Sequence, residues 1–222
     1  MENNITPFDA ANKDKLTNDE YLWASSITIA DKFSVIDDIE SIPEQRKRTL
    51  RCLHGAMGIV TEVGEIANAF HKEDMDIPNL IEELGDVLWY IAIFEREYPV
   101  ACGTLRQTDK NFYPHMISVD MALCAAEITD IFKRKLFYNA CIDFKRLKEN
   151  LSCLKGAIEF VGDAYGYSIE QVRAINIKKL WQRFNVDYTK IEPQISMFSE
   201  DLAINRNLEL ERAILEDISN DN

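Results

Sequence analysis

MGIVTEVGEIANAFHKEDMDIPNLIEELGDVLWYIAIF, residues 57–94, is the stretch of sequence that decides the fold. Apolar residues recur at helical spacing on both sides of a polar turn at residues 71–76. Pro78 lies near the start of the second apolar segment, where a helix tolerates proline. The stretch therefore predicts two amphipathic helices, over about residues 44–72 and 78–98, which can pack as an antiparallel hairpin.

Each predicted helix carries two carboxylates three positions apart, Glu62 with Glu65 and Glu83 with Asp86. Residues at this spacing share a helix face, so the hairpin would bring all four carboxylates together. Packed carboxylates repel one another at low dielectric, and a ligand set made only of oxygen favours a hard cation such as Mg²⁺ or Mn²⁺. Taken alone, the spacing fits either a metal site or two solvated helix faces.

A helix-interior glycine accompanies each carboxylate pair, Gly64 in the first and Gly85 in the second. Glycine costs a helix interior about 1 kcal/mol relative to alanine. It is tolerated where another backbone or a ligand comes close. We therefore expect a close approach at both pairs.

The composition is that of a globular all-α protein. The 222 residues include only six prolines and eight glycines, and no useful length of β-type alternation appears. A net charge of −13 argues against nucleic acid as a partner. The five cysteines form no Cys-x-x-Cys pair, which favours reduced thiols in the cytoplasm. We find neither a signal peptide nor an apolar run of membrane-spanning length, so no membrane association is expected.

The remaining organisation follows from helical periodicity and capping signals. Thr17 with Glu20, and Ser168 with Gln171, have the spacing of capping boxes. Residues 1–16 are predicted to be flexible, and residues 99–115 to form a loop. The further predicted helices cover residues 17–33, 118–138, 143–165, 168–184 and, in the C-terminal extension 185–222, residues 201–216.

A weak internal echo links the two halves of the chain. Glu127 and Asp130 repeat the spacing of the first carboxylate pair, while Ser152 stands where Asp86 would fall. The region 99–165 is thus either an insertion or a degenerate repeat of the hairpin, and chance similarity between amphipathic helices explains the echo equally well.

With both pairs placed, the chain resembles the all-α nucleoside triphosphate pyrophosphohydrolases. These are the MazG-like proteins and the related dimeric dUTPases and dCTPases. The resemblance rests on TEVGEIANAFHK, NLIEELGDVLWYIA and SIEQVRAINIKKLWQRF and covers about residues 17–184. It implies a helical bundle with a four-helix core, into which residues 99–165 would insert a hairpin. The longer variants found in many phages are similar, and a phage protein would act in the host cytoplasm.

The resemblance implies metal-dependent hydrolysis of an NTP or dNTP to the monophosphate and pyrophosphate. Glu62, Glu65, Glu83 and Asp86 would hold Mg²⁺, with Mn²⁺ as the alternative ion. Glu65 is our choice of general base, and Glu62 is nearly as good a candidate. A homodimer or homotetramer is also implied.

Six further residues are candidates for substrate contacts, and each also has a purely structural explanation. Lys179 and Arg183 lie four apart on one helix and could clamp phosphate oxygens, as could Lys72. Asn176 could contact the sugar or a phosphate. Trp89 could stack on the base, and His54 could reach the substrate.

Two other functions remain open from the sequence. One is a non-catalytic helical interaction protein whose acidic pairs are surface features. The other is a phosphoribosyl-ATP pyrophosphohydrolase, which differs in its substrate.

Overall fold

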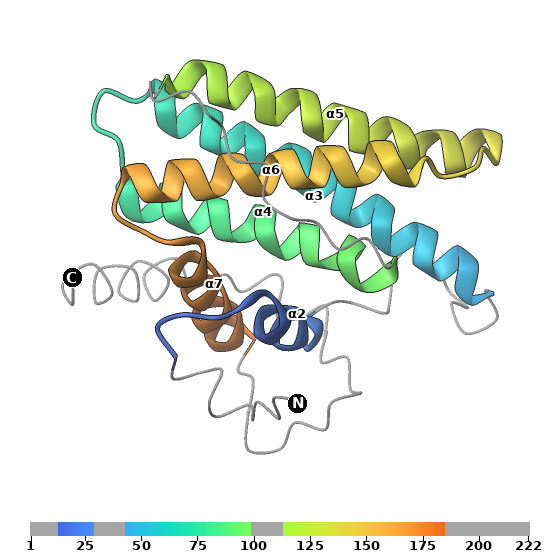
Figure 1. Cartoon of the computed structure of the whole chain (residues 1–222), viewed down its shortest axis with the longest axis horizontal. Coiled ribbons are helices and arrows are strands. Elements are labelled where there is room, and N and C mark those ends of the chain that lie inside the picture. Colours follow the sequence, from blue (N-terminus) through green and yellow to red (C-terminus); the bar gives the residue numbers. More distant parts are fainter. Residues whose placement is uncertain (1–12, 29–42, 99–112, 185–222) are drawn as a thin grey trace.

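The computed structural model describes residues 13–28, 43–98 and 113–184. Within these ranges the chain forms six helices and no strand, so the predicted all-α fold is confirmed. The helices, labelled as in Figure 1, are α2 (Asn18–Ser26), α3 (Glu44–His71), α4 (Ile77–Glu97), α5 (Pro114–Tyr138), α6 (Phe144–Ala164) and α7 (Ile169–Arg183).

The helices α3 and α4 form the predicted antiparallel hairpin. The carboxylate of Asp76 accepts a hydrogen bond from the backbone N–H of Asn79 at 3.1 Å and so caps α4, with Pro78 in the first turn. Glycines bring the two helices together, because a Cβ at Gly58 would lie 2.2 Å from the ring of Tyr90. The hairpin is thus closely packed along the segment that carries the carboxylates.

Four helices, α3 to α6, run along the long axis of the molecule and form one bundle (Figure 1). The helix α5 packs against α3, and α6 packs against α5 and α4. The hairpin α5–α6 is therefore half of the bundle and not an appendage to it. The helices α2 and α7 cross below, where both pack on α4 and on each other.

Local signals in the sequence explain the helix starts. Both capping boxes form, at Thr17 of α2 and at Ser168 of α7. The helix α5 begins at Pro114, four residues before its predicted start, because proline suits the first turn of a helix. Within the segment predicted to be flexible, Leu16 is fully buried and its N–H donates to the carbonyl of Glu170 at 3.0 Å.

The carboxylates of the internal echo, Glu127 and Asp130, make ion pairs with a side chain of the neighbouring helix. Arg146 of α6 contacts both Glu127 and Asp130 of α5. An arginine thus supplies the positive charge at this pair. Among the described residues, the group suited to a metal lies on α3 and α4 instead.

Several predictions fall outside the described residues: the part of the first helix beyond residue 28, most of the loop at 99–115, and the C-terminal helix at 201–216.

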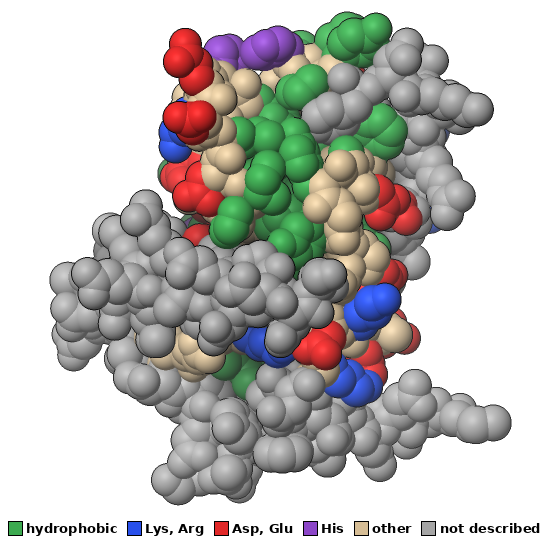
Figure 2. All heavy atoms as spheres, turned by 90° about the vertical axis from the view of Figure 1, so that its left-hand side faces the viewer, with side chains coloured by type: hydrophobic (Ala, Val, Ile, Leu, Met, Phe, Trp, Pro, Cys, Tyr) green, Lys and Arg blue, Asp and Glu red, His purple; other side chains and the backbone are tan. Residues whose placement is uncertain are grey.

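None of the described helices is both long and apolar enough to span a bilayer. Figure 2 shows one end of the molecule, where acidic side chains flank an apolar area and histidines lie along its upper edge.

Candidate metal centre

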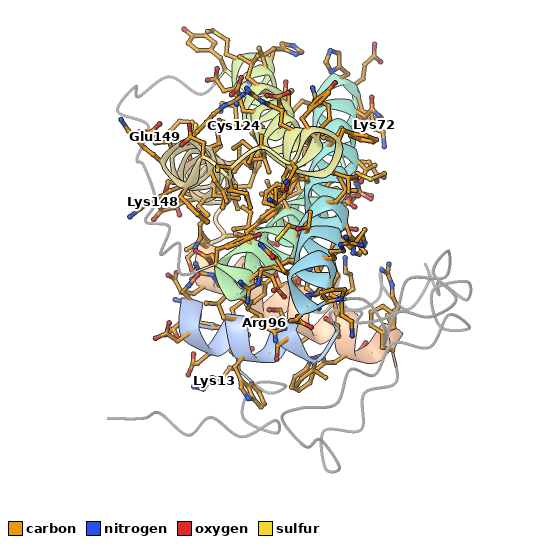
Figure 3. The ribbon with its side chains drawn as sticks, turned by 90° about the vertical axis from the view of Figure 1, so that its right-hand side faces the viewer. Lys13, Lys72, Arg96, Cys124, Lys148 and Glu149 are labelled. Atoms are coloured by element: carbon orange, nitrogen blue, oxygen red, sulfur yellow. The ribbon has the colours of Figure 1, made fainter. Side chains whose placement is uncertain are left out.

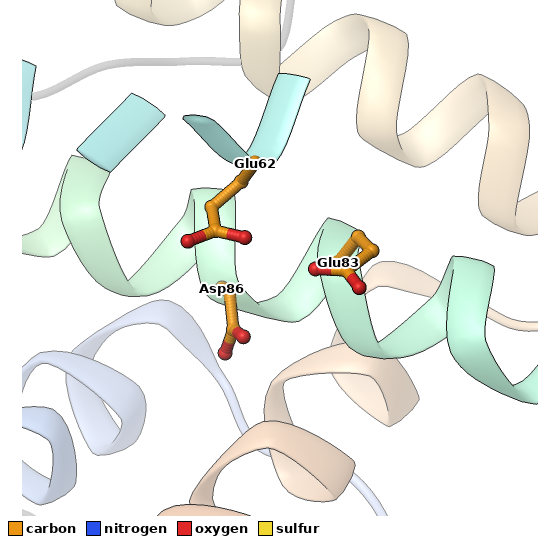
Figure 4. Close-up of side chains that lie close together, drawn as sticks. All are labelled: Glu62, Glu83 and Asp86. Atoms are coloured by element: carbon orange, nitrogen blue, oxygen red, sulfur yellow. The ribbon is translucent and has the colours of Figure 1, made fainter. Parts of the chain in front are cut away.

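Three carboxylates converge between α3 and α4. Glu62 projects from α3 toward Glu83 and Asp86 of α4, as Figure 4 shows. Each offers one oxygen, and these three oxygens lie within 4.8 Å of one another. Three of the four predicted ligands therefore meet, for the predicted reason that residues three apart share a helix face.

The acidic cluster, meaning Glu62, Glu83 and Asp86, lies in a place that disfavours negative charge. Burial, followed by the nearby charge of Asp86, raises the pKa of Glu62 to about 7. Burial, followed by a hydrogen bond with Glu62, raises the pKa of Glu83 to about 10. Two ionised carboxylates have no hydrogen to share, so a hydrogen bond between Glu62 and Glu83 requires a proton on one of them.

One buried lysine supplies positive charge to the cluster. Lys179 of α7 is 1% exposed, and its ammonium donates to both oxygens of Asp86, at 2.6 and 2.7 Å. Its third contact is with Glu82 at 3.1 Å. Lys179 is thus a counter-ion of the acidic cluster, whereas the sequence suggested that it would face phosphate.

The side chain of Asn176, like that of Lys179, contacts protein groups and not solvent. It is fully buried, and its Nδ2 donates to Oδ1 of Asp86 at 2.7 Å. Its Oδ1 accepts from the hydroxyl of Tyr21 on α2 at 2.8 Å. Gly85 permits this approach, because a Cβ there would lie 2.8 Å from the Cβ of Asn176.

The fourth predicted ligand, Glu65, does not join the three oxygens. Its side chain is exposed. Its charge nevertheless contributes to the raised pKa values of Glu62 and Glu83, so it lies at the edge of the cluster. Gly64, for which we expected a close approach, has nothing within 4 Å of a built Cβ, so that expectation was wrong.

Lys72 lies apart from the cluster, exposed at the C-terminal end of α3 (Figure 3). It is ten residues beyond Glu62, which corresponds to about 15 Å along a helix axis. A role for Lys72 in holding phosphate would need the substrate to extend along α3.

An aromatic group adjoins the cluster on α3 and α4. His54 packs edge-on against Trp89 and Tyr90, with ring centroids 6.1 and 5.6 Å away. Trp89 is 7% exposed, and its indole N–H donates to Thr28 at 2.8 Å. Tyr90 is close enough to the carboxylates to feel their charge: burial raises its pKa, and the charges of Glu62 and Asp86 raise it further.

Arg183 ends α7 beside this group. It is half-buried, and its charge acts on both Tyr90 and Lys179. Of the two basic residues of α7 predicted to hold phosphate, Arg183 is the one whose side chain is partly open to solvent.

Sequence reasoning missed two buried polar residues at the site. Glu82 was not among the predicted site residues, but it is 5% exposed and binds Lys179. We did not single out Tyr21 as a site residue, although a tyrosine on the apolar face of a short helix needs a partner for its hydroxyl once buried. That requirement is the signal that could have found it.

An all-α bundle with a carboxylate cluster on one hairpin defines a class of protein, a helical protein with a candidate centre for a hard cation. Comparison with known families makes this specific. The family model of the MazG nucleotide pyrophosphohydrolase domain matches residues 55–98, which include the acidic cluster, Glu65 and most of α3 and α4. The match and the all-helical structure confirm the predicted resemblance to MazG-like proteins. Searches of curated proteins and of solved structures gave no match.

Proposed function

We propose that this protein hydrolyses a nucleoside or deoxynucleoside triphosphate to the monophosphate and pyrophosphate, with a divalent metal ion as cofactor. The observation that carries the proposal is the convergence of Glu62, Glu83 and Asp86, whose oxygens lie within 4.8 Å of one another, on the hairpin that the MazG domain model matches. A cation between these carboxylates would relieve the repulsion between their charges.

The residues present fit a hard cation. Glu62, Glu83 and Asp86 would hold Mg²⁺, or Mn²⁺ in its place, through oxygen atoms alone. Glu65 would join them if its exposed side chain turned inward. When bound, the ion would neutralise triphosphate charge and lower the pKa of a coordinated water.

Two residues of this chain would have separate parts in the reaction. The carboxylate of Glu65 would accept a proton from the attacking water, because it lies at the edge of the cluster and faces solvent. Glu62 is the alternative base. Arg183 would contact a phosphate through its guanidinium, which suits bidentate contact with phosphate oxygens.

Lys179 and Asn176 would act on the cluster and not on the substrate. Both are buried and bonded to Asp86, so they would fix its carboxylate. Hydrogen-bonded partners of this kind orient ligating carboxylates in metal sites. The nucleobase of the substrate would contact the partly exposed rings of His54 and Tyr90. Trp89 would pack against both of these rings and support them.

The test is release of pyrophosphate from a panel of the eight common NTPs and dNTPs and phosphoribosyl-ATP, with Mg²⁺ or with EDTA. We expect metal-dependent release that Glu83→Gln and Glu65→Gln abolish. Glu73→Gln, which removes an exposed acid from the turn after α3, is the matched control and should remain active. If the folded protein releases no pyrophosphate from any of these substrates, the function as a non-catalytic helical interaction protein is favoured instead.

We also propose that copies of the chain assemble as a homodimer or homotetramer. Apolar side chains exposed on the outer side of α5, Met116, Val119 and Leu123, are compatible with such assembly. Light scattering tests it directly, because a mass near the 25.6 kDa of one chain would contradict it.

A further inference from the structure

The side chain of Tyr21 is almost completely buried, and its hydroxyl has a specific partner. The side chain is 2% exposed, and burial raises the pKa of its phenol well above the ordinary value, so the hydroxyl keeps its proton. The hydroxyl lies 2.8 Å from Oδ1 of Asn176 and 3.3 Å from the carbonyl of Gly85. A phenol donates one hydrogen bond, and the shorter contact is with Asn176.

The direction of the hydrogen bonds from Tyr21 to the cluster is fixed by chemistry. An ionised carboxylate only accepts, so the amide nitrogen of Asn176 must face Asp86. The amide oxygen then faces Tyr21, which donates to it. If the amide turned over, the hydrogen bond to Asp86 would be lost, and the phenol could donate only to the carbonyl of Gly85 at 3.3 Å. The 2.8 Å donation from the phenol to Oδ1 of Asn176 therefore favours the orientation in which Asn176 donates to Asp86.

Three helices must hold their positions for this arrangement. Tyr21 comes from α2, Asn176 from α7, and Asp86 from α4. Gly85 lets α7 approach α4, since any Cβ at that position would press on Asn176. The capping box between Thr17 and Glu20 fixes the first turn of α2, and Tyr21 is the next residue.

We propose that Tyr21 is a positioning residue for the metal centre, which acts through Asn176 to orient the carboxylate of Asp86. This inference rests on the proposed function for the identity of the cofactor, but it assigns a role to a residue outside the segment that the family model matches. Tyr21 itself does not touch the metal or the substrate. Its part is to hold one oxygen of Asp86 in place by keeping a hydrogen-bond donor on it.

The test compares Tyr21→Phe, Asn176→Leu and the double variant with the wild type. Mn²⁺ alone is titrated and followed by electron paramagnetic resonance, and the Mg²⁺ concentration for half-maximal hydrolysis is measured separately. We expect Tyr21→Phe to weaken Mn²⁺ binding about 10- to 100-fold, as loss of outer partners of metal ligands does. The double variant should bind no more weakly than Asn176→Leu, because both changes break one connected chain.

Tyr98→Phe is the matched control. Tyr98 is a buried phenol at the other end of α4, packed on Phe132 with ring centroids 6.3 Å apart. Its loss of a hydroxyl should leave Mn²⁺ affinity unchanged. If Tyr21→Phe fails to fold, Tyr21→Met takes its place, since methionine also removes the hydroxyl and its flexible side chain can fill the buried space.

Mn²⁺ affinity of Tyr21→Phe within twofold of the wild type would overturn the proposal. So would losses that multiply in the double variant, or a wild type that binds no Mn²⁺. A wild type that binds Mn²⁺ but hydrolyses no nucleotide would refute the proposed function, while the affinities of the variants would still decide the role of Tyr21.

Discussion

A hydrogen bond between Glu62 and Glu83 can exist only while one of them is protonated, because two carboxylates offer acceptors and no donor. Burial is the main cause of the raised pKa of each, and Asp86 and Glu65 add negative charge nearby. A proton and a cation therefore compete for the same oxygens. Metal binding should release protons and should strengthen as the pH rises through about 7.

The stability of the metal-free protein should fall as the pH rises from about 5.5 to 8. The pKa values of Glu62 and Glu83, about 7 and about 10, exceed the ordinary 4.5, so the folded state holds protons that the unfolded state has released. The slope can reach about 1.4 kcal/mol per pH unit for each such proton. Urea unfolding in EDTA across this range measures it.

Glu83→Gln is the variant that tests this assignment, because a glutamine does not titrate. It should unfold at higher urea concentration than the wild type at pH 8 and show a flatter pH dependence. Glu20 and Glu44, whose pKa values are lowered by ion pairs, gain their stabilising effect at lower pH and do not contribute in this window. Wild-type stability that rises between pH 5.5 and 8 would contradict the raised pKa values of Glu62 and Glu83.

Arg183→Gln should raise the KM for the nucleotide about 10- to 100-fold and change kcat less. A hydrogen bond to a charged group is worth about 1.5–3 kcal/mol, and loss of a contact made equally in the ground and transition states appears in KM. Lys178→Gln is the matched control, since Lys178 is on the same helix but pairs with Asp14 at 3.0 Å. Equal KM values for the two variants would exclude phosphate contact by Arg183.

For individual residues, the sequence predicted which side chains lie close together but not the direction in which each of them points. Glu62, Glu83 and Asp86 meet because spacing on a helix fixes a shared face. Asn176 and Lys179, which we predicted as candidates for substrate contacts, also lie near the cluster, but they bind its carboxylate and are buried. Their orientation depends on how α7 crosses α4, a contact between residues far apart in the chain that no local pattern encodes.

The two glycines of the hairpin have opposite surroundings, and this difference tests how α7 docks. A Cβ at Gly85 would lie 2.8 Å from Asn176, whereas a Cβ at Gly64 would meet nothing within 4 Å. Gly64→Ala should therefore raise the free energy of unfolding by up to about 1 kcal/mol, the helix-propensity gain. Gly85→Ala should lower it by about 1–3 kcal/mol through overpacking.

Gly85→Ala should also weaken Mn²⁺ binding, because α7 carries both Asn176 and Lys179 to Asp86. Chemical unfolding and Mn²⁺ titration of the two variants side by side check both statements, and Gly64→Ala serves as the control for adding a methyl group to the hairpin. Full stability and full Mn²⁺ affinity in Gly85→Ala would show that the close approach of α7 to α4 is not required.

Helix ends were predictable where a side chain caps the backbone, as at Thr17 and Ser168. The start of α5 was not, because Pro114 was taken as part of a loop although proline is equally suited to a first helical turn. Gly64 was misread for a related reason. A glycine in a helix marks a cost, but the pattern does not tell whether a neighbour or open space lies opposite it.

For the whole molecule, the sequence predicted the helices and the α3–α4 hairpin better than their assembly. Residues 99–165 were predicted to be an insertion or a degenerate repeat, which stays a prediction, and the sequence did not indicate that α5 and α6 would lie beside α3 and α4 in one bundle. Which helices pair is decided by burial over long sequence separations. The family model reflects this limit, since it matches the local hairpin at residues 55–98 and not the helices that enclose it.

The metal should stabilise the whole fold, because its ligands come from two helices and their hydrogen-bonded partners from a third. A ligand that binds only the folded state adds about 2.7 kcal/mol at one hundred times its Kd. For a chain of this length that corresponds to a rise in Tm of about 5–10 °C. Thermal unfolding in Mg²⁺ and in EDTA measures it. Glu83→Gln should show little difference between the two conditions, and Glu73→Gln, on the exposed turn, should respond as the wild type does. Equal Tm values for the wild type in Mg²⁺ and EDTA would mean that the cluster holds its proton in preference to a cation.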